Sequence, residues 1–125
     1  MSDINARIYL PLEEQGTNLG EKYAEVNVIE NADPCKSLNP GATTSEDVTI
    51  NNIPFLKESG SDAGAGNIYD WVSYSTTKDN ACINLSFVLH STNPGNYPTP
   101  PPEFDKEAES AVFDTIMSTF GFITQ

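Results

Sequence analysis

The chain has 125 residues, enough for one domain, and its apolar content of 38% is ordinary for a protein with a packed core. Its 18 acidic and 6 basic residues give a net charge of −12, which repels nucleic-acid phosphates and anionic lipids. No apolar run approaches the roughly 20 residues of a membrane-spanning helix, so neither nucleic-acid binding nor a transmembrane segment is expected.

The N-terminal half is expected to supply strands. Residues 6–10 predict a first strand that stops at Pro11, because proline cannot donate to a β-ladder. Residues 22–30 alternate apolar and polar side chains, which is typical of a half-buried strand. Residues 48–58 predict either one edge strand or two short strands joined by a bend at Pro54.

The clearest local pattern is a β-hairpin over residues 68–89, in which two strand-like runs flank the short turn 78–80. The Gly-rich residues 59–67 that precede it predict a surface turn. Residues 91–102 contain five prolines and predict a stiff, extended strap. Two of these prolines have the spacing of a ligand for proline-recognising domains, but the usual basic neighbour is absent, which favours the strap.

Two helices are expected. Residues 103–122 place apolar side chains at steps of four and acidic residues near the start, which predicts an amphipathic helix packed on a sheet. A second helix is expected within residues 13–23, although Gly16 and Gly20 disfavour it. Strands followed by a terminal helix predict an α+β domain with a largely antiparallel sheet covered by helices.

The segment 80–93 predicts a strand with two different faces. One face is apolar and must point to the core: Ile83, Leu85, Phe87 and Leu89. The other carries a thiol, an amide, a hydroxyl and an imidazole: Cys82, Asn84, Ser86, Val88 and His90. This second face is either a chemical site or the solvated back of the sheet.

A small hydrolase using His90, the single histidine, is the alternative function. Such an enzyme needs a nucleophile, a base and an orienting acid in contact, and the available partners are Ser86, Asp70 and Asp79. However, Ser86 and His90 would lie about 13 Å apart along a strand, and the sequence has no GxSxG elbow. A structural histidine is therefore favoured, and no catalytic residue is assigned.

Other candidate sites are weaker. Neighbouring carboxylates such as Glu107 and Glu109 arise by chance in so acidic a chain, and those of the C-terminal helix are expected on its exposed face. The sequence has no calcium or zinc ligand pattern, so neither a metal nor another cofactor is expected. Exposed aromatic side chains beside acidic ones can form a ligand or partner surface, although such residues more often belong to the core or cover the sheet. The residues of a possible binding site are His90, Ser86, Trp71 and Tyr74.

Cys35 and Cys82 are the only cysteines and lack zinc-ligand spacing. Both flank strand-like segments, so either a disulfide or two buried free thiols fits the pattern. A disulfide would indicate an oxidising compartment. The first ten residues lack the basic start and apolar middle of a signal peptide, so an exported protein would have lost its signal.

Three stretches together resemble an uncharacterised group of bacterial secreted or lipid-anchored proteins: GTNLGEKYAEVNV, ACINLSFVLHSTN and ESAVFDTIMSTFGF. The group combines a TNLxEKY strand entry, a cysteine in each half and an FDxIxSTFxF terminal helix. The resemblance implies export, a Cys35–Cys82 disulfide, and a sandwich of antiparallel sheet and flanking helices similar to the PsbP and Mog1 proteins. It implies no catalytic residues.

These observations predict a single exported α+β domain over residues 1–125. Its expected role is that of a non-enzymatic binding or accessory module at the bacterial cell envelope. The expected partner is a protein or a small-molecule ligand of unspecified identity.

Overall fold

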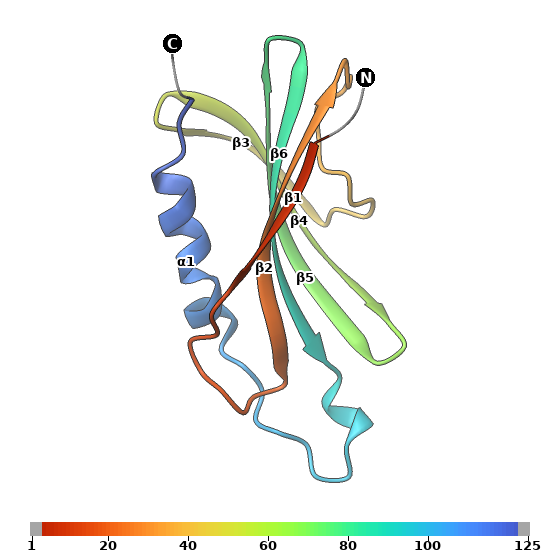
Figure 1. Ribbon diagram of the computed structural model, residues 1–125. Helices are drawn as coiled ribbons and strands as arrows, with labels where there is room; N and C mark the ends of the chain where they lie inside the picture. The colour runs from red at the N-terminus through yellow and green to blue at the C-terminus, as the bar shows by residue number, and fades with distance from the viewer. Residues whose placement is uncertain (1–3, 123–125) are drawn as a thin grey trace.

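The structure is a computed structural model that describes residues 4–122, which form one curved sheet and one α-helix (Figure 1). The helix, α1, spans Lys106–Ser118 and is preceded by a 3₁₀ turn at Pro94–Asn96. The strands are β1 Ile4–Leu10, β2 Leu19–Glu30, β3 Thr44–Ile50, β4 Ile53–Gly64, β5 Asn67–Lys78 and β6 Ala81–Thr92. Their order is β1-β2-β6-β5-β4-β3, and all neighbours are antiparallel.

The prediction of an α+β sandwich with a second helix is wrong. Over the described residues the domain is mostly β, and α1 is its one α-helix. The segment expected to be helical forms a bend-rich loop up to Asn18 and then enters β2 at Leu19. Gly16 has a φ of 83°, a left-handed conformation that a right-handed helix does not contain.

Strands β3 to β6 form a meander joined by three two-residue turns. Both residues of each turn have positive φ: Asn51–Asn52, Ala65–Gly66 and Asp79–Asn80. Such type I′ turns match the twist of the flanking strands, and Asn, Asp and Gly adopt them most easily. The predicted hairpin over residues 68–89 is confirmed as β5 and β6.

Two turns lie elsewhere than predicted. Residues 48–58 do form two strands, but the chain reverses before Ile53, and Pro54 lies inside β4. Residues 59–67, expected to be a surface turn, mostly belong to β4, whose pairing with β5 continues to Gly64↔Asn67. The small residues there do not end the strand, because β5 supplies a partner along its whole length.

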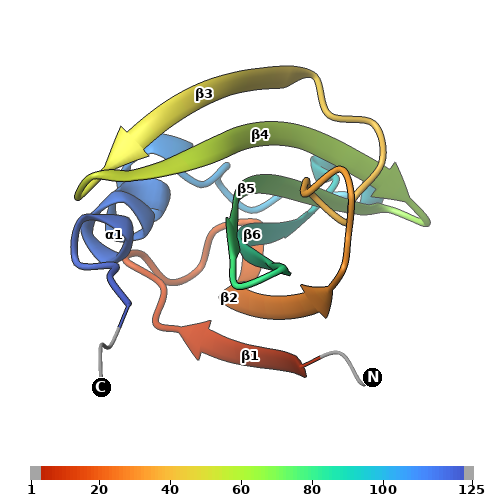
Figure 2. The ribbon, with the colours of Figure 1, turned by 90° about the horizontal axis from the view of Figure 1, so that it is seen from above.

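The central strand β6 has the two faces that its alternation predicts. Its apolar side chains lie under α1, and the sheet curves around the helix, so this side is concave (Figure 2). The buried core on this side comprises Leu19, Phe55, Tyr74, Leu85, Phe87, Leu89, Phe113 and Met117.

Side chains hold both ends and the centre of α1. The Asp105 carboxylate caps the start by accepting a hydrogen bond from the Ala108 N–H. At the centre, the Phe113 ring stacks on Phe87 with 4.9 Å between ring centres. At the end, the Asn51 amide of the β3–β4 turn donates to the Ser118 and Phe120 carbonyls.

A buried ion pair ties α1 to β2. Lys22 Nζ donates to the carbonyl oxygen of Glu109 at 2.9 Å and to its Oε1 at 3.2 Å. The Glu109 carboxylate also accepts the backbone N–H groups of Glu13 and Glu14. The expectation that the acids of this helix are exposed is therefore wrong for Glu109, whose charge is compensated by these donors.

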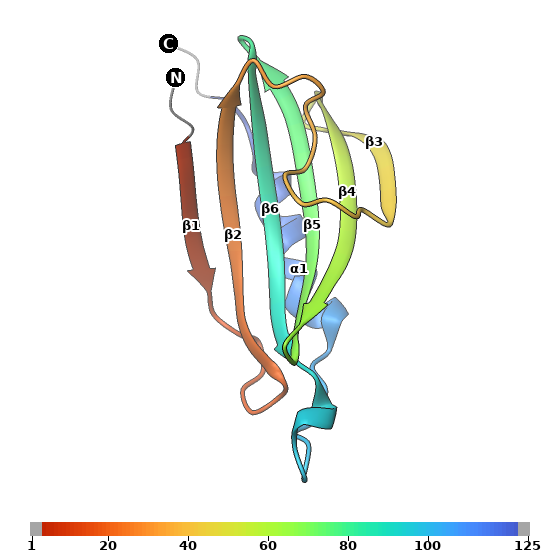
Figure 3. The same ribbon diagram turned by 90° about the vertical axis from the view of Figure 1, so that its right-hand side faces the viewer.

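The convex face, opposite α1, carries polar side chains and a smaller apolar cluster of Tyr23, Trp71 and Val88, and is largely covered. The loop of residues 31–43 crosses it (Figure 3), and a disulfide between Cys35 and Cys82 fastens this loop to β6. The predicted disulfide is thus confirmed. Beneath the loop, the buried Asn84 amide donates to the Ser73 and Ser75 hydroxyls, each at 2.7 Å.

Candidate functional site

A groove lies between α1 and the outer strands on the concave face. Its main cavity has a volume of about 410 Å³, a size common among small-ligand sites. A second hollow of about 330 Å³ continues it toward β3 and shares Lys57, Tyr74 and Asp114 with the first. We call the two together the helix–sheet groove. The apolar floor of the main cavity consists of Val72, Tyr74, Phe87, Leu89 and Phe113.

The groove exists because α1 covers only part of the concave face. The Lys22–Glu109 pair holds the helix toward β2, and Phe113 holds it over β6 at Phe87. The sheet continues past the helix into β5, β4 and β3. Apolar side chains on these strands, such as the half-buried Val72, therefore line an open hollow beside the helix.

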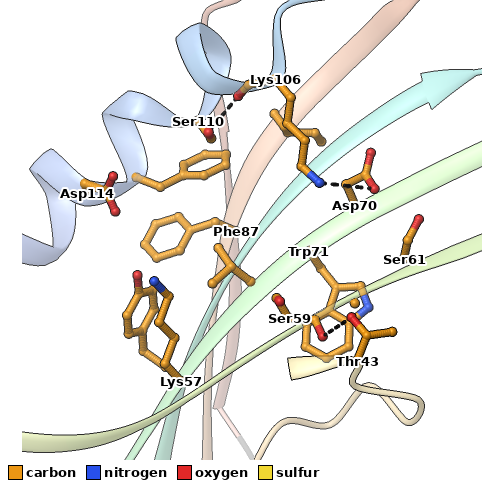
Figure 4. A pocket seen from close by; sticks show the side chains of 15 residues that line it. Thr43, Lys57, Ser59, Ser61, Asp70, Trp71, Phe87, Lys106, Ser110 and Asp114 are labelled. Carbon is orange, nitrogen blue, oxygen red and sulfur yellow. Dashed lines mark hydrogen bonds and ion pairs between the residues drawn. The ribbon is translucent and has the colours of Figure 1, made fainter. Parts of the chain in front are cut away.

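The rim of the groove carries both signs of charge. Lys106 at the start of α1 pairs with Asp70 of β5, with 3.7 Å between Nζ and Oδ1 (Figure 4). Lys57 Nζ lies 5.7 Å from the centre of the Tyr74 ring, and Asp114 of α1 lines the same cavity. These two lysines balance the two aspartates, so the groove is electrically neutral in a strongly acidic protein.

Tyr74 places a neutral hydroxyl in the groove. Burial raises the pKa of Tyr74 above its usual 10.0, and the Lys57 ammonium lowers it in part while the Asp114 carboxylate raises it. The phenol therefore stays protonated at neutral pH and is able to donate or accept a hydrogen bond.

Trp71, the single tryptophan, borders the main cavity (Figure 4), but its indole lies on the convex side of the sheet, since Trp71 pairs with Val88. Its ring packs with Tyr23 and Val88, and a Cβ added at Gly60 would lie 2.8 Å from the indole Cζ2. Because Gly60 has no side chain, the indole lies directly against β4. The indole Nε1 is buried and has no hydrogen-bond partner among residues 4–122.

His90 lies outside the groove, and both of its ring nitrogens face oxygen atoms. Nδ1 lies 3.0 Å from Glu21 Oε1 and Nε2 lies 2.9 Å from Asn67 Oδ1. The ring also stacks on Tyr69, with 4.3 Å between ring centres. Neither nitrogen contacts a hydroxyl or a thiol within the described chain, although a hydrolase would require such a contact.

The structure separates the four residues proposed for binding. Tyr74 points into the groove. Trp71 borders the main cavity, but its indole packs beside Val88 on the convex face, to which Ser86 and His90 also point. Ser86 is buried and donates to Asn84 Oδ1 at 2.8 Å, so it belongs to the polar cluster beneath the covering loop. Within residues 4–122, no group of three or more His, Cys, Asp or Glu side chains is placed to hold a metal ion.

Four groove residues are absent from the sequence-based prediction. Lys106, Ser110 and Asp114 of α1 follow one another at steps of four, which places them on one face of the helix and was a usable signal. Lys57 gave no such signal, because its place depends on the pairing Lys57↔Tyr74 between β4 and β5.

In the part of the chain that the structure describes, no helix has the length and apolar character needed to cross a bilayer. No known protein family matches the chain, and no curated protein sequence matches it. A similar solved structure is that of a protein of unknown function, PA94 from Pseudomonas aeruginosa, with a TM-score of 0.67 and 10% sequence identity. The match covers 100% of this chain and 87% of that protein, and at this identity it shows a shared fold alone.

Proposed function

We propose that this protein is a non-catalytic binding domain that acts outside the cytoplasm, at the bacterial cell envelope, and holds its ligand in the helix–sheet groove. One observation carries the proposal: a cavity of about 410 Å³ joins an aromatic floor to a rim of paired charges and hydroxyls. Ligand sites are typically concave and mostly apolar, with a few polar groups that orient the ligand.

The Cys35–Cys82 disulfide supports a place outside the cytoplasm. Such bonds form and persist in oxidising compartments, whereas cytosolic thiols are kept reduced. The bacterial envelope is the compartment that the resemblance of the three sequence stretches favours.

The chemistry of the groove supports binding rather than catalysis. Lys106 is paired with Asp70, and Tyr74 is a neutral phenol. The hydroxyl groups that line the groove, such as Ser110, have no histidine beside them, since His90 lies on the other face of the sheet. Acyl transfer or hydrolysis needs a nucleophile with a base in contact.

The proposal is tested with the fluorescent probe 8-anilinonaphthalene-1-sulfonate, which has an aromatic body and one negative charge. Ser110→Phe fills the groove from the helix side, and the matched control Thr115→Phe adds the same ring on an exposed part of α1. We expect the folded protein to bind the probe and Ser110→Phe to weaken binding at least about tenfold, a change of about 1.4 kcal/mol. Thr115→Phe should bind like the wild type.

Equal binding by both variants, or no binding by the wild type, would contradict the proposed function. His90→Ala tests the hydrolase alternative in the same assay, because His90 makes no contact with the groove. Probe binding should persist in His90→Ala. A hydrolytic activity that this substitution abolishes would favour an enzyme instead.

A further inference from the structure

We propose that the natural occupant of the helix–sheet groove is an extended, basic peptide segment of a partner protein, which adds as a strand to the free edge of β4. This inference rests on the proposed function, because it identifies the class of ligand that the same groove takes.

The edge of β4 is free over its last five residues. β3 pairs with β4 only as far as Thr44↔Ser59, and the Thr43 N–H donates to the Ser59 carbonyl at 2.7 Å. Beyond this point β4 continues to Gly64 with β5 on one side only (Figure 3). The free stretch, residues 60–64, borders the main cavity through Gly60 and Ser61.

The backbone groups on this edge are available for pairing. In a strand, the N–H and C=O of one residue point to the same side, and successive residues alternate. Ser59 bonds toward β3, so Ser61 and Ala63 point to the same open side. In the described chain neither residue has a hydrogen-bond partner on that side. An added strand would meet two unpaired donors and two unpaired acceptors.

The free end of β4 is less shielded than the other two edges of the sheet, because its one charge, Asp62, attracts a basic strand. The edge strand β1 carries Arg7, and the edge strand β3 carries Glu46 and Asp47. Residues 60–64 are Gly-Ser-Asp-Ala-Gly, without lysine or proline, and such small residues allow close approach by another backbone.

The side chains beside this edge define the peptide. A peptide residue opposite Ser61 would place its side chain on the concave face, beside Asp70 and toward the apolar floor. The peptide residues before and after it would lie near Asp62, which has no ion pair in the described chain. With a net charge of −12, the protein attracts cations, so the best occupant has alternate apolar residues and basic flanks.

Amide hydrogen exchange measured by NMR tests the strand addition directly. The probe is a seven-residue peptide of alternating valine and threonine with a lysine at each end. We expect the peptide to slow exchange at Ser61 and Ala63 at least about tenfold. Gly60 and Asp62 should change little, because their N–H groups already point toward β5.

Ala63→Pro provides the matching variant, because it removes one N–H on the open side, where an edge strand tolerates proline. We expect it to weaken peptide binding at least about tenfold relative to Ala63→Ser, which changes the same side chain but keeps the N–H. A peptide whose amide nitrogens on the edge toward β4 are N-methylated cannot donate to β4. It should bind the unaltered protein more weakly than the unmethylated peptide, so the test does not depend on the folding of Ala63→Pro.

The outcomes separate this inference from the proposed function. The peptide could change the NMR resonances of groove residues without slowing amide exchange at Ser61 and Ala63. That result would overturn the strand addition and leave the groove as a ligand site. Failure of both the peptide and the naphthalene probe to bind would overturn both proposals. Protection of Ser61 and Ala63 that rises with protein concentration alone would show that a second copy of this chain occupies the edge, and would also overturn the peptide.

Discussion

Lys22 of β2 and Glu109 of α1 form an ion pair from which water is excluded, with 3.2 Å between Nζ and Oε1 and at most 1% of either side chain exposed. Burying two charges is unfavourable, but leaving one of them buried without its partner is worse. Since Glu109 also accepts the N–H groups of Glu13 and Glu14, the pair fixes the β1–β2 loop as well as the helix. The position of α1, and with it the width of the groove, depends on this contact.

Lys22→Met should lower the free energy of unfolding by about 3–5 kcal/mol, because it leaves the Glu109 carboxylate buried without its cation. The double variant Lys22→Met/Glu109→Gln should lose less than the sum of the two single variants, since no lone charge remains. Urea denaturation of the four proteins measures both effects. Additive losses would show that the two side chains are not coupled.

Acid should weaken the fold through Glu109. Burial alone would raise the pKa of this carboxyl, but hydrogen bonds from the Glu13 N–H, Lys22 and the Glu14 N–H outweigh it and hold the pKa below 4.5. A depressed pKa means that the stabilisation is present above pH 4.5 and disappears as the pH falls through the folded value.

Glu109→Gln has no such titration and isolates the effect. The free energy of unfolding of the wild type should therefore exceed that of Glu109→Gln by less at about pH 3 than at about pH 7. Urea unfolding at each pH measures this difference. A difference in the free energy of unfolding that stays the same at both pH values would contradict the role assigned to the carboxylate.

Gly60→Ala should disturb Trp71. The new Cβ would lie 2.8 Å from the indole Cζ2 and 3.1 Å from the Gly41 carbonyl oxygen, so either the ring or the loop must move. We expect a loss of about 1–3 kcal/mol and a shift of the tryptophan emission, which reports this one site because the chain has a single tryptophan. Gly64→Ala, which meets nothing within 4 Å, is the matched control and should leave the emission unchanged.

Replacing Cys35 and Cys82 with serine should lower the stability by about 4 kcal/mol, because the bond closes a loop between residues 47 positions apart. Probe binding in the groove should survive wherever the variant remains folded, since the disulfide lies on the convex face. Thermal unfolding and the probe titration check the two statements separately. A variant that stays as stable as the wild type would show that the bond constrains little of the unfolded chain.

Local patterns in the sequence predicted the strands and their faces but not the partners. Alternation assigned the apolar side of β6 correctly, because a strand shows its two faces within a few residues. The pairing of β2 with β6 joins segments that are far apart in the chain, as in Val26↔Leu85, and no local pattern records it. The error at residues 13–23 has the same origin, since strand pairing with β6 decided the conformation from Leu19 onward.

The candidate site was predicted only in part, for a physical reason. Trp71 and Tyr74 attract notice by residue type, but Tyr74 points into the groove whereas the Trp71 indole packs on the convex face beside Val88. Ser86 and His90 attract notice in the same way, yet each makes its own hydrogen bonds on the convex face, Ser86 to Asn84 and His90 to Glu21, instead of forming a site. Lys22 and Glu109 resemble ordinary surface charges in the sequence, because burial of a charge depends on a partner that only the fold supplies.

The disulfide also bears on the order in which the sheet assembles. Cys82 lies opposite Ile29 in the β2–β6 ladder, and Cys35 follows soon after the end of β2. Once the sulfurs are joined, a short covalent bridge holds β2 and β6 close together, and the entropy of closing a long loop no longer slows their search for the correct register. The oxidised chain should therefore refold faster than the reduced one, and the pairing of β2 with β6 should begin at the end next to the disulfide.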